Sequence, residues 1–279
     1  MEAIINRIID CSFVDGPGNR TAIFFQGCNY RCTYCHNPET ISLCNACGAC
    51  VAGCPVGALT LTEGKVLWNA AKCIACDSCI HSCPRQASPR VTRMSPEVLM
   101  ERIAANRPFI HGITVSGGEC TLNAEYLLAL FPMVHRLGLT CLIDSNGSYS
   151  FRRDPELLNA CDGVMLDVKS TDAEEYRSLT GAGGTQVLDE AVYLAKHGRL
   201  TEVRTVCSPN FLSELTVRRV CERLAPLQAA ASVRYRLIAY RPYGVRQPYR
   251  GRITPPDAAF MQRLLEIALA SGMQNAVIC

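Results

Sequence analysis

Residues 21–40 read "TAIFFQGCNYRCTYCHNPET": a short apolar run, a glycine, and then three cysteines with the spacing C-x3-C-x2-C. The run 21–26 is rich in β-branched and aromatic residues, which favours a β-strand. Cys28, Cys32 and Cys35 follow this strand directly. Three thiolates can hold a cubane iron–sulfur cluster but leave one iron without a protein ligand. The stretch therefore predicts a strand that delivers a metal-binding loop with one open position.

The rest of the chain alternates between strand-like and helix-like segments. Strands are predicted at 21–26, 112–116, 139–144, 163–168, 201–206 and 233–239, and helices at 95–107, 123–138, 187–198, 213–225 and 255–272. About six such alternations favour a parallel sheet with helices on its outer face. An eight-unit barrel needs more residues than the chain offers. The predicted fold class is α/β, a partial (β/α)6 barrel.

Polar motifs follow four of the predicted strands at their carboxyl ends, where parallel α/β sheets place their chemistry. They are "QGCNYRC" (26–32), "SGGEC" (116–120), "DSNG" (144–147) and "DVK" (167–169). Gly117 and Gly118 allow a ligand to approach bare backbone, and Glu119 adds an acceptor for an ammonium group. Asp167 and Lys169 alternate along a strand and therefore face the same side. Taken alone, these motifs also fit ordinary turns and a partly buried ion pair.

Two further cysteine groups have a spacing of their own. Residues 44–55 read "CNACGACVAGCP" and residues 73–84 read "CIACDSCIHSCP", both C-x2-C-x2-C-x3-C-P. Bacterial two-cluster ferredoxins use this spacing, and the fourth cysteine of each run ligates the other cluster. The predicted ligand sets are Cys44, Cys47, Cys50 and Cys83 for one cluster and Cys54, Cys73, Cys76 and Cys79 for the other. Structural zinc, which needs four ligands in total, fits two runs of four less well.

The predicted organisation is a core in two parts, 1–43 and 91–279, with a ferredoxin-like insert at 44–90 between them. The net charge of +3 over 279 residues is too small to indicate nucleic-acid binding. No run of about 18 apolar residues suggests a membrane span, and the start of the chain does not resemble a secretory signal. A cytoplasmic location is expected, where the 18 cysteines serve metal binding rather than disulfides.

The motifs resemble a known family. The spacing C-x3-C-x-aromatic-C, with Tyr34 as the aromatic residue, is the signature of radical S-adenosylmethionine (radical SAM) enzymes. Residues 12–38, "SFVDGPGNRTAIFFQGCNYRCTYCHNP", resemble the start of glycyl-radical-enzyme activating enzymes, relatives of pyruvate formate-lyase activase. The insert together with "GITVSGGE", "CLIDSNG" and "CDGVMLDVK" is most similar to the YjjW group, within the branch that carries two extra clusters.

This resemblance implies an activity, cofactors and partners. A [4Fe–4S] cluster on Cys28, Cys32 and Cys35 would bind S-adenosylmethionine at its open iron and cleave it reductively. The resulting 5′-deoxyadenosyl radical would take a hydrogen atom from a backbone glycine of a partner enzyme. The implied cofactors are three [4Fe–4S] clusters, S-adenosylmethionine and a monovalent cation near Asp144. The implied partners are a glycyl radical enzyme and an electron donor such as flavodoxin or ferredoxin.

The resemblance also implies which residues contact the cofactor. They are Tyr34, Cys35, His36, Gly117, Gly118, Glu119, Asp144, Ser145, Asp167, Val168, Lys169 and Arg204. Arg241 joins them because it stands where many relatives carry a histidine that contacts the cofactor.

Two other functions remain open at this point. One is radical chemistry on a small molecule or a peptide. Peptide-modifying relatives carry an additional cysteine group towards the C-terminus, whereas the cysteines after Cys83 are scattered. The other is an iron–sulfur electron carrier, for which the three-cysteine group would have no purpose.

Overall fold

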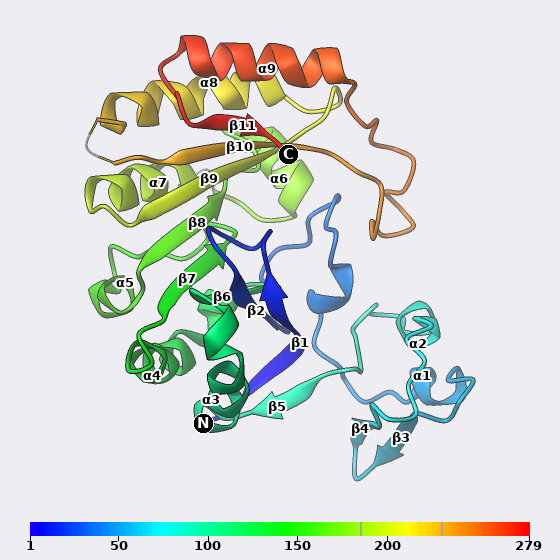
Figure 1. The fold of residues 1–279 in the computed structure, drawn as a ribbon. Helices are drawn as coiled ribbons and strands as arrows, with labels where there is room; N and C mark the ends of the chain where they lie inside the picture. The colour runs from blue at the N-terminus through cyan, green and yellow to red at the C-terminus, as the bar shows by residue number, and fades with distance from the viewer. Residues whose placement is uncertain (185, 230) are drawn as a thin grey trace.

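The computed structural model describes residues 1–184, 186–229 and 231–279 and arranges most of them around one nine-stranded sheet (Figure 1). Six parallel strands form its centre. They are β2 (Arg20–Phe25), β6 (Gly112–Gly117), β7 (Thr140–Ser145), β8 (Gly163–Asp167), β9 (Leu200–Cys207) and β10 (Arg234–Ala239). These are the six predicted strands at nearly the predicted bounds, and they confirm the α/β fold class with a partial barrel.

Three strands that the sequence did not predict extend the sheet at its edges. β11 (Ala276–Ile278) pairs in parallel with β10. At the other edge, β1 (Ala3–Ser12) lies antiparallel to β2, and β5 (Thr92–Met94) lies antiparallel to β1. The central parallel strands therefore have neighbours on both sides, and the exposed edges are the short strands β5 and β11.

Helices connect the parallel strands and cover the outer side of the curved sheet (Figure 1). The α-helices of the barrel are α3 (Pro96–Asn106), α4 (Ala124–His135), α5 (Pro155–Ala160), α6 (Ala173–Thr180), α7 (Val187–Lys196), α8 (Ser213–Leu224) and α9 (Ala258–Ala270). Four 3-10 turns accompany them: η1 (Pro38–Thr40), η2 (Arg107–Phe109), η3 (Cys120–Asn123) and η4 (Ala225–Leu227). Within the described part of the chain, no helix has both the length and the apolar character that a membrane crossing requires.

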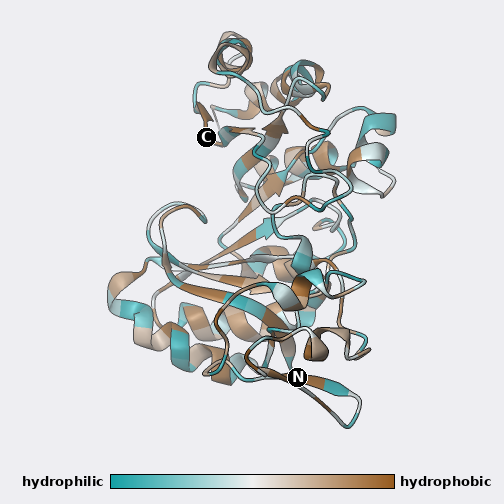
Figure 2. Cartoon of the chain, turned by 90° about the vertical axis from the view of Figure 1, so that its right-hand side faces the viewer, coloured by the Kyte–Doolittle hydropathy of each residue, from teal (hydrophilic) through white to brown (hydrophobic). Residues whose placement is uncertain are grey.

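Each central parallel strand has one face in the apolar core and the opposite face on the side of the candidate site. In β8, Val164 and Leu166 are fully buried in the main apolar cluster between sheet and helices, whereas Asp167 belongs to the opposite face. Figure 2 shows apolar residues along the strands and mixed apolar and polar residues on the outer helices. Burial of the apolar outer face against the helices thus stabilises the sheet, and the inner face can carry charged side chains.

Residues 44–90 form a small unit beside the main sheet (Figure 1). It contains α1 (Ala49–Ala52), the antiparallel hairpin β3 (Leu59–Thr62) and β4 (Lys65–Trp68), and α2 (Ser78–His81). Its own apolar cluster is built on Cys50, Leu59 and Cys79. The two cysteine runs repeat the same backbone: α1 and α2 follow left-handed residues at matching positions, Ala46 and Gly48 in one run, Ala75 and Asp77 in the other.

Candidate active site

A cavity of about 260 Å³ opens at the carboxyl ends of the parallel strands. It lies where the sequence placed the polar motifs, because each of the six central parallel strands contributes its last residues or the loop that follows. The lining residues are Cys28, Tyr30, Cys32, Tyr34, Cys35, His36, Asn37, Ser116, Gly117, Gly118, Asp144, Ser145, Asn146, Asp167, Lys169, Arg204, Val206 and Ile238. Most residues predicted to contact a cofactor therefore meet in one place.

The loop with the three cysteines is held from two sides. The N–H of Cys28 donates to the carbonyl of Ile41 at 3.0 Å, on the side of η1. On the other side, the N–H groups of Arg31 and Thr33 donate to carbonyls at the end of α6, each at 2.8 Å. Burial raises the pKa of the Cys28 thiol to about 11 and that of Cys35 to about 12. A metal that displaces the thiol protons would be needed to make them thiolates at neutral pH.

Two carboxylates and two cations face one another inside the cavity. Lys169 Nζ lies 2.9 Å from Asp167 Oδ2, and Arg204 Nη1 lies 3.0 Å from Asp144 Oδ1. The Ser116 hydroxyl donates to the second oxygen of Asp144 at 2.9 Å. Burial by itself raises the pKa of Asp167, but Lys169 and then Arg204 bring it below its usual value. Burial raises the pKa of Asp144, and Arg204 only partly offsets this. Asp167 is thus the carboxylate that stays ionised most readily.

Three residues predicted to contact a cofactor do not line the cavity. Glu119 is only 1% exposed, and its carboxylate accepts from Thr121 Oγ1 at 2.6 Å, from Ser145 Oγ at 3.0 Å and from the N–H of Asn146 at 2.7 Å. It therefore fastens the loop after β6 to the loop after β7. Val168 points into the apolar core, as strand alternation requires next to Asp167.

Arg241 is the third of these residues. Its side chain is exposed, and its backbone carbonyl lies 2.9 Å from His36 Nε2. The chain after β10 thus reaches the site through backbone, and the apolar side chain of Ile238 lines the cavity on that strand. The Arg241 side chain is not among the residues that line the cavity, and its contact with the cofactor stays a prediction.

Glu202 is a site-supporting residue that the sequence reasoning missed. It is 1% exposed and accepts from Arg204 Nε, while Arg236 Nη1 lies 3.6 Å from it and Arg234 Nη1 4.0 Å. Arg204 is therefore held between Glu202 and Asp144. Glu202 and Arg204 are two residues apart in β9 and therefore share one face, as Asp167 and Lys169 do at the end of β8. This alternation could have predicted the pair from the sequence.

Replacing Glu202 with glutamine should destabilise the fold by about 2 kcal/mol, because Arg204 loses one of its two buried counter-charges. The measurement is urea unfolding followed by circular dichroism. Glu214→Gln is the matched control, since its pair with Arg218 lies on the surface of α8 with both side chains 52% exposed. That change should cost less than about 0.5 kcal/mol. Equal costs for the two variants would contradict the buried role of Glu202.

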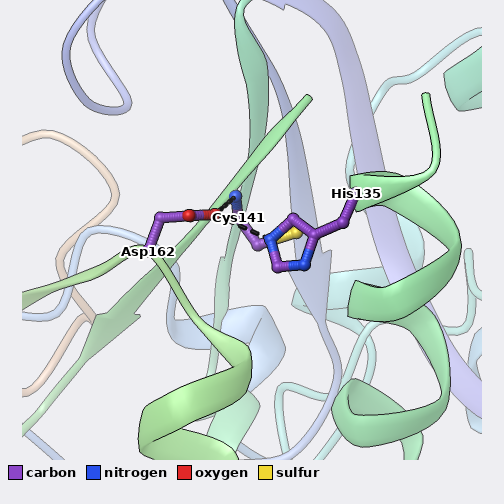
Figure 3. Close-up of side chains that lie close together, drawn as sticks. All are labelled: His135, Cys141 and Asp162. Atoms are coloured by element: carbon purple, nitrogen blue, oxygen red, sulfur yellow. Dashed lines mark hydrogen bonds and ion pairs between the residues drawn. The ribbon is translucent and has the colours of Figure 1, made fainter. Parts of the chain in front are cut away.

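A second group of potential ligands lies at the amino ends of β7 and β8, on the opposite edge from the cavity (Figure 3). Asp162 Oδ2 lies 2.8 Å from His135 Nε2 and accepts the backbone N–H of Cys141 at 2.6 Å. Burial raises the pKa of the Cys141 thiol, so it is protonated. Hydrogen bonds explain why the three residues approach one another, and the group ties the end of α4 to the start of β7.

Comparison with known proteins gives the cavity a family context. Residues 22–211 match the model of the radical SAM superfamily. The chain is 34% identical over 165 residues to a putative glycyl-radical enzyme activating enzyme of Haemophilus influenzae. This alignment covers 59% of this chain and 47% of that protein. It is 31% identical over 246 residues to the choline trimethylamine-lyase activating enzyme of Oleidesulfovibrio alaskensis, covering 81% of this chain and 79% of the relative.

A solved structure extends the likeness to the whole fold. The crystal structure of QueE from Escherichia coli superposes with a TM-score of 0.53 at 16% identity, over 100% of this chain and 93% of that one. At this identity the likeness concerns the fold alone. The family model and the sequence relatives carry the assignment: the chain belongs to the radical SAM superfamily and, within it, to the glycyl-radical-enzyme activating enzymes.

Proposed function

We propose that this chain cleaves S-adenosylmethionine reductively and passes the resulting radical to a backbone glycine of a partner enzyme. The observation that carries the proposal is the set of three cysteines on one side of a cavity whose other walls hold Asp167, Lys169 and Arg204. An iron–sulfur cluster bound to the three cysteines would supply the electron and an open iron for the cofactor. The relatives' names support a glycyl radical enzyme as the partner.

The cavity offers a complement for each polar part of S-adenosylmethionine. Lys169 and Arg204 can pair with its carboxylate, and the ionised Asp167 can accept from ribose hydroxyls. Gly117 and Gly118 present backbone at the cavity wall, where the amino group would lie. The monovalent cation predicted near Asp144 would compete with the Arg204 guanidinium for the same carboxylate.

The insert fits the proposal of two further clusters. A separate hollow is lined by Cys54, Cys73, Cys76 and Cys79, the set that cross-ligation predicts. The pKa of the Cys50 thiol is raised to about 11, by burial and then by its neighbours Cys44, Cys79 and Cys83. Cys44 and Cys83 belong to the same predicted ligand set as Cys50, and Cys79 belongs to the first set.

Two complete runs of four cysteines suit two multi-iron clusters better than a single zinc ion, which needs four ligands in total. We also propose that the chain belongs to the YjjW group and that its electron donor is of the flavodoxin or ferredoxin type.

Iron content tests the number of clusters. After anaerobic reconstitution we expect about twelve irons per chain, four for each cluster. Colorimetric iron assay against protein concentration by amino-acid analysis gives the ratio. A value near four would restrict the clusters to the site, and a value near eight would leave the insert with only one. The function itself is tested by 5′-deoxyadenosine release under dithionite, and by a glycyl radical signal in the partner.

A further inference from the structure

The two cysteine runs of the insert share a backbone but not their side-chain surroundings. Ser78 in α2 corresponds to Ala49 in α1 at the constant offset that relates the two runs. By the same offset, Arg90 corresponds to Leu61 in β3. The hollow with Cys54, Cys73, Cys76 and Cys79 therefore has a hydroxyl and a guanidinium where the other ligand set has apolar groups.

Arg90 is built into the wall of this hollow. It lines the hollow together with the four cysteines, and its side chain is only 21% exposed. Arg90 Nη2 lies 2.5 Å from Asp77 Oδ1, which orients the guanidinium, while the Asp77 side chain is 53% exposed and therefore well screened by water.

Two uncharged polar side chains face the same cysteines. The Cys76 thiol donates to Ser78 Oγ at 3.3 Å, and once Cys76 is a thiolate the Ser78 hydroxyl can donate to it instead. The indole N–H of Trp68 is buried, lines the hollow, and has no hydrogen-bond acceptor within the part of the chain that the structure describes. A buried N–H without an acceptor is costly, so a sulfur-rich group in the hollow would satisfy it.

At the corresponding place, the other ligand set has an apolar contact, although Cys44 and Cys47 themselves are exposed. A Cβ built on Gly48 would lie 3.2 Å from Leu61 Cδ2, so Leu61 packs directly on the loop of Cys47 and Cys50. A leucine side chain offers a sulfur neither a positive charge nor a hydrogen-bond donor.

We propose that the two insert clusters are electronically inequivalent, and that the one held by Cys54, Cys73, Cys76 and Cys79 is the more easily reduced. This inference rests on the proposed function, because it requires both clusters to be present. Reduction would add one electron to the cluster. The additional negative charge would be stabilised by the positive charge of Arg90 and by hydrogen-bond donors from Trp68 and Ser78. Hydrogen bonds to the sulfurs and local charge are established determinants of cluster potential.

Potentiometric titration of the reconstituted holoenzyme, with dithionite as reductant and electron paramagnetic resonance as readout, tests this. The site cluster is identified as the one whose spectrum changes on addition of S-adenosylmethionine. We expect two distinct insert potentials in the natural protein. In Arg90→Met, the ratio of reduced to oxidised cluster at fixed potential should fall about tenfold for the higher-potential cluster alone, which is about 59 mV for one electron.

Two further variants keep the test decisive. Lys65→Met removes an exposed positive charge from β4 and should leave both insert potentials unchanged. Trp68→Phe should lower the same potential as Arg90→Met, even if the latter binds iron poorly. Equal potentials in the natural protein, or a shift of the lower potential only, would overturn the inference. About four irons in the natural protein would instead refute the proposed insert clusters themselves.

Discussion

Replacing Cys32 with alanine is expected to reduce the release of 5′-deoxyadenosine from S-adenosylmethionine to the level of a sample without protein. Cys32 is the central ligand of the three and is 8% exposed. The site loop offers no fourth cysteine that could substitute, so the cluster would lose a third of its protein ligands. Chromatography of anaerobic reactions that contain excess dithionite measures the release without requiring the partner enzyme.

Cys76→Ala is the matched comparison, because it removes one cysteine from the insert instead. With excess dithionite it should retain measurable 5′-deoxyadenosine release, since an external reductant can reach the site cluster directly. With a flavodoxin as donor, release should fall sharply. If Cys76→Ala abolished dithionite-driven release as completely as Cys32→Ala, the insert clusters would be part of the catalytic centre rather than its electron supply.

The sequence predicted the central sheet well because its strands carry a strong local signal. Apolar β-branched runs such as residues 112–116 are buried on both faces near the sheet centre. A strand that is buried on both faces is expected to have such a continuous apolar run, so the run predicts the strand. β1 escaped prediction because its segment "AIINRIIDCS" contains Asn6 and Arg7 and lies near the sheet edge, where burial alternates irregularly. α5 and α6 are too short for a helical period to emerge, although Asp154 and Asp172 cap them.

The candidate site shows the same division between local and long-range information. Strand alternation brought Asp167 and Lys169 to one face, and the structure pairs them. No local pattern could show that Glu119 is enclosed by partners from the loop after β7. The direction of the chain after β10 likewise depends on a contact between His36 and the carbonyl of Arg241, which lie far apart in sequence.

Gly117→Ala should destabilise the fold by up to about 5 kcal/mol, the second large effect that the structure predicts. Gly117 has φ +114°, where a side chain adds strain of about 1–2 kcal/mol. Its Cβ would also overlap the backbone N and O of Phe25, and would lie 2.8 Å from the carbonyl carbon of Phe24. Gly117 pairs with Phe25 where β6 meets β2. Neither strand can retreat, because both have neighbours on the other side, so overpacking adds up to about 3 kcal/mol.

Gly138→Ala is the matched control, because it introduces the backbone strain of a positive φ without a steric clash. Gly138 has φ +74° in the turn after α4, and a Cβ there would meet no atom within 4 Å. It should therefore cost only the strain of about 1–2 kcal/mol. Urea unfolding of both variants, with unchanged m-values, gives the comparison. Because the same glycine ends β6 at the cavity wall, Gly117→Ala should also weaken S-adenosylmethionine binding, which Gly138→Ala should leave intact. Similar stability losses in the two variants would mean that β2 and β6 are not packed as tightly at Gly117 as this structure shows.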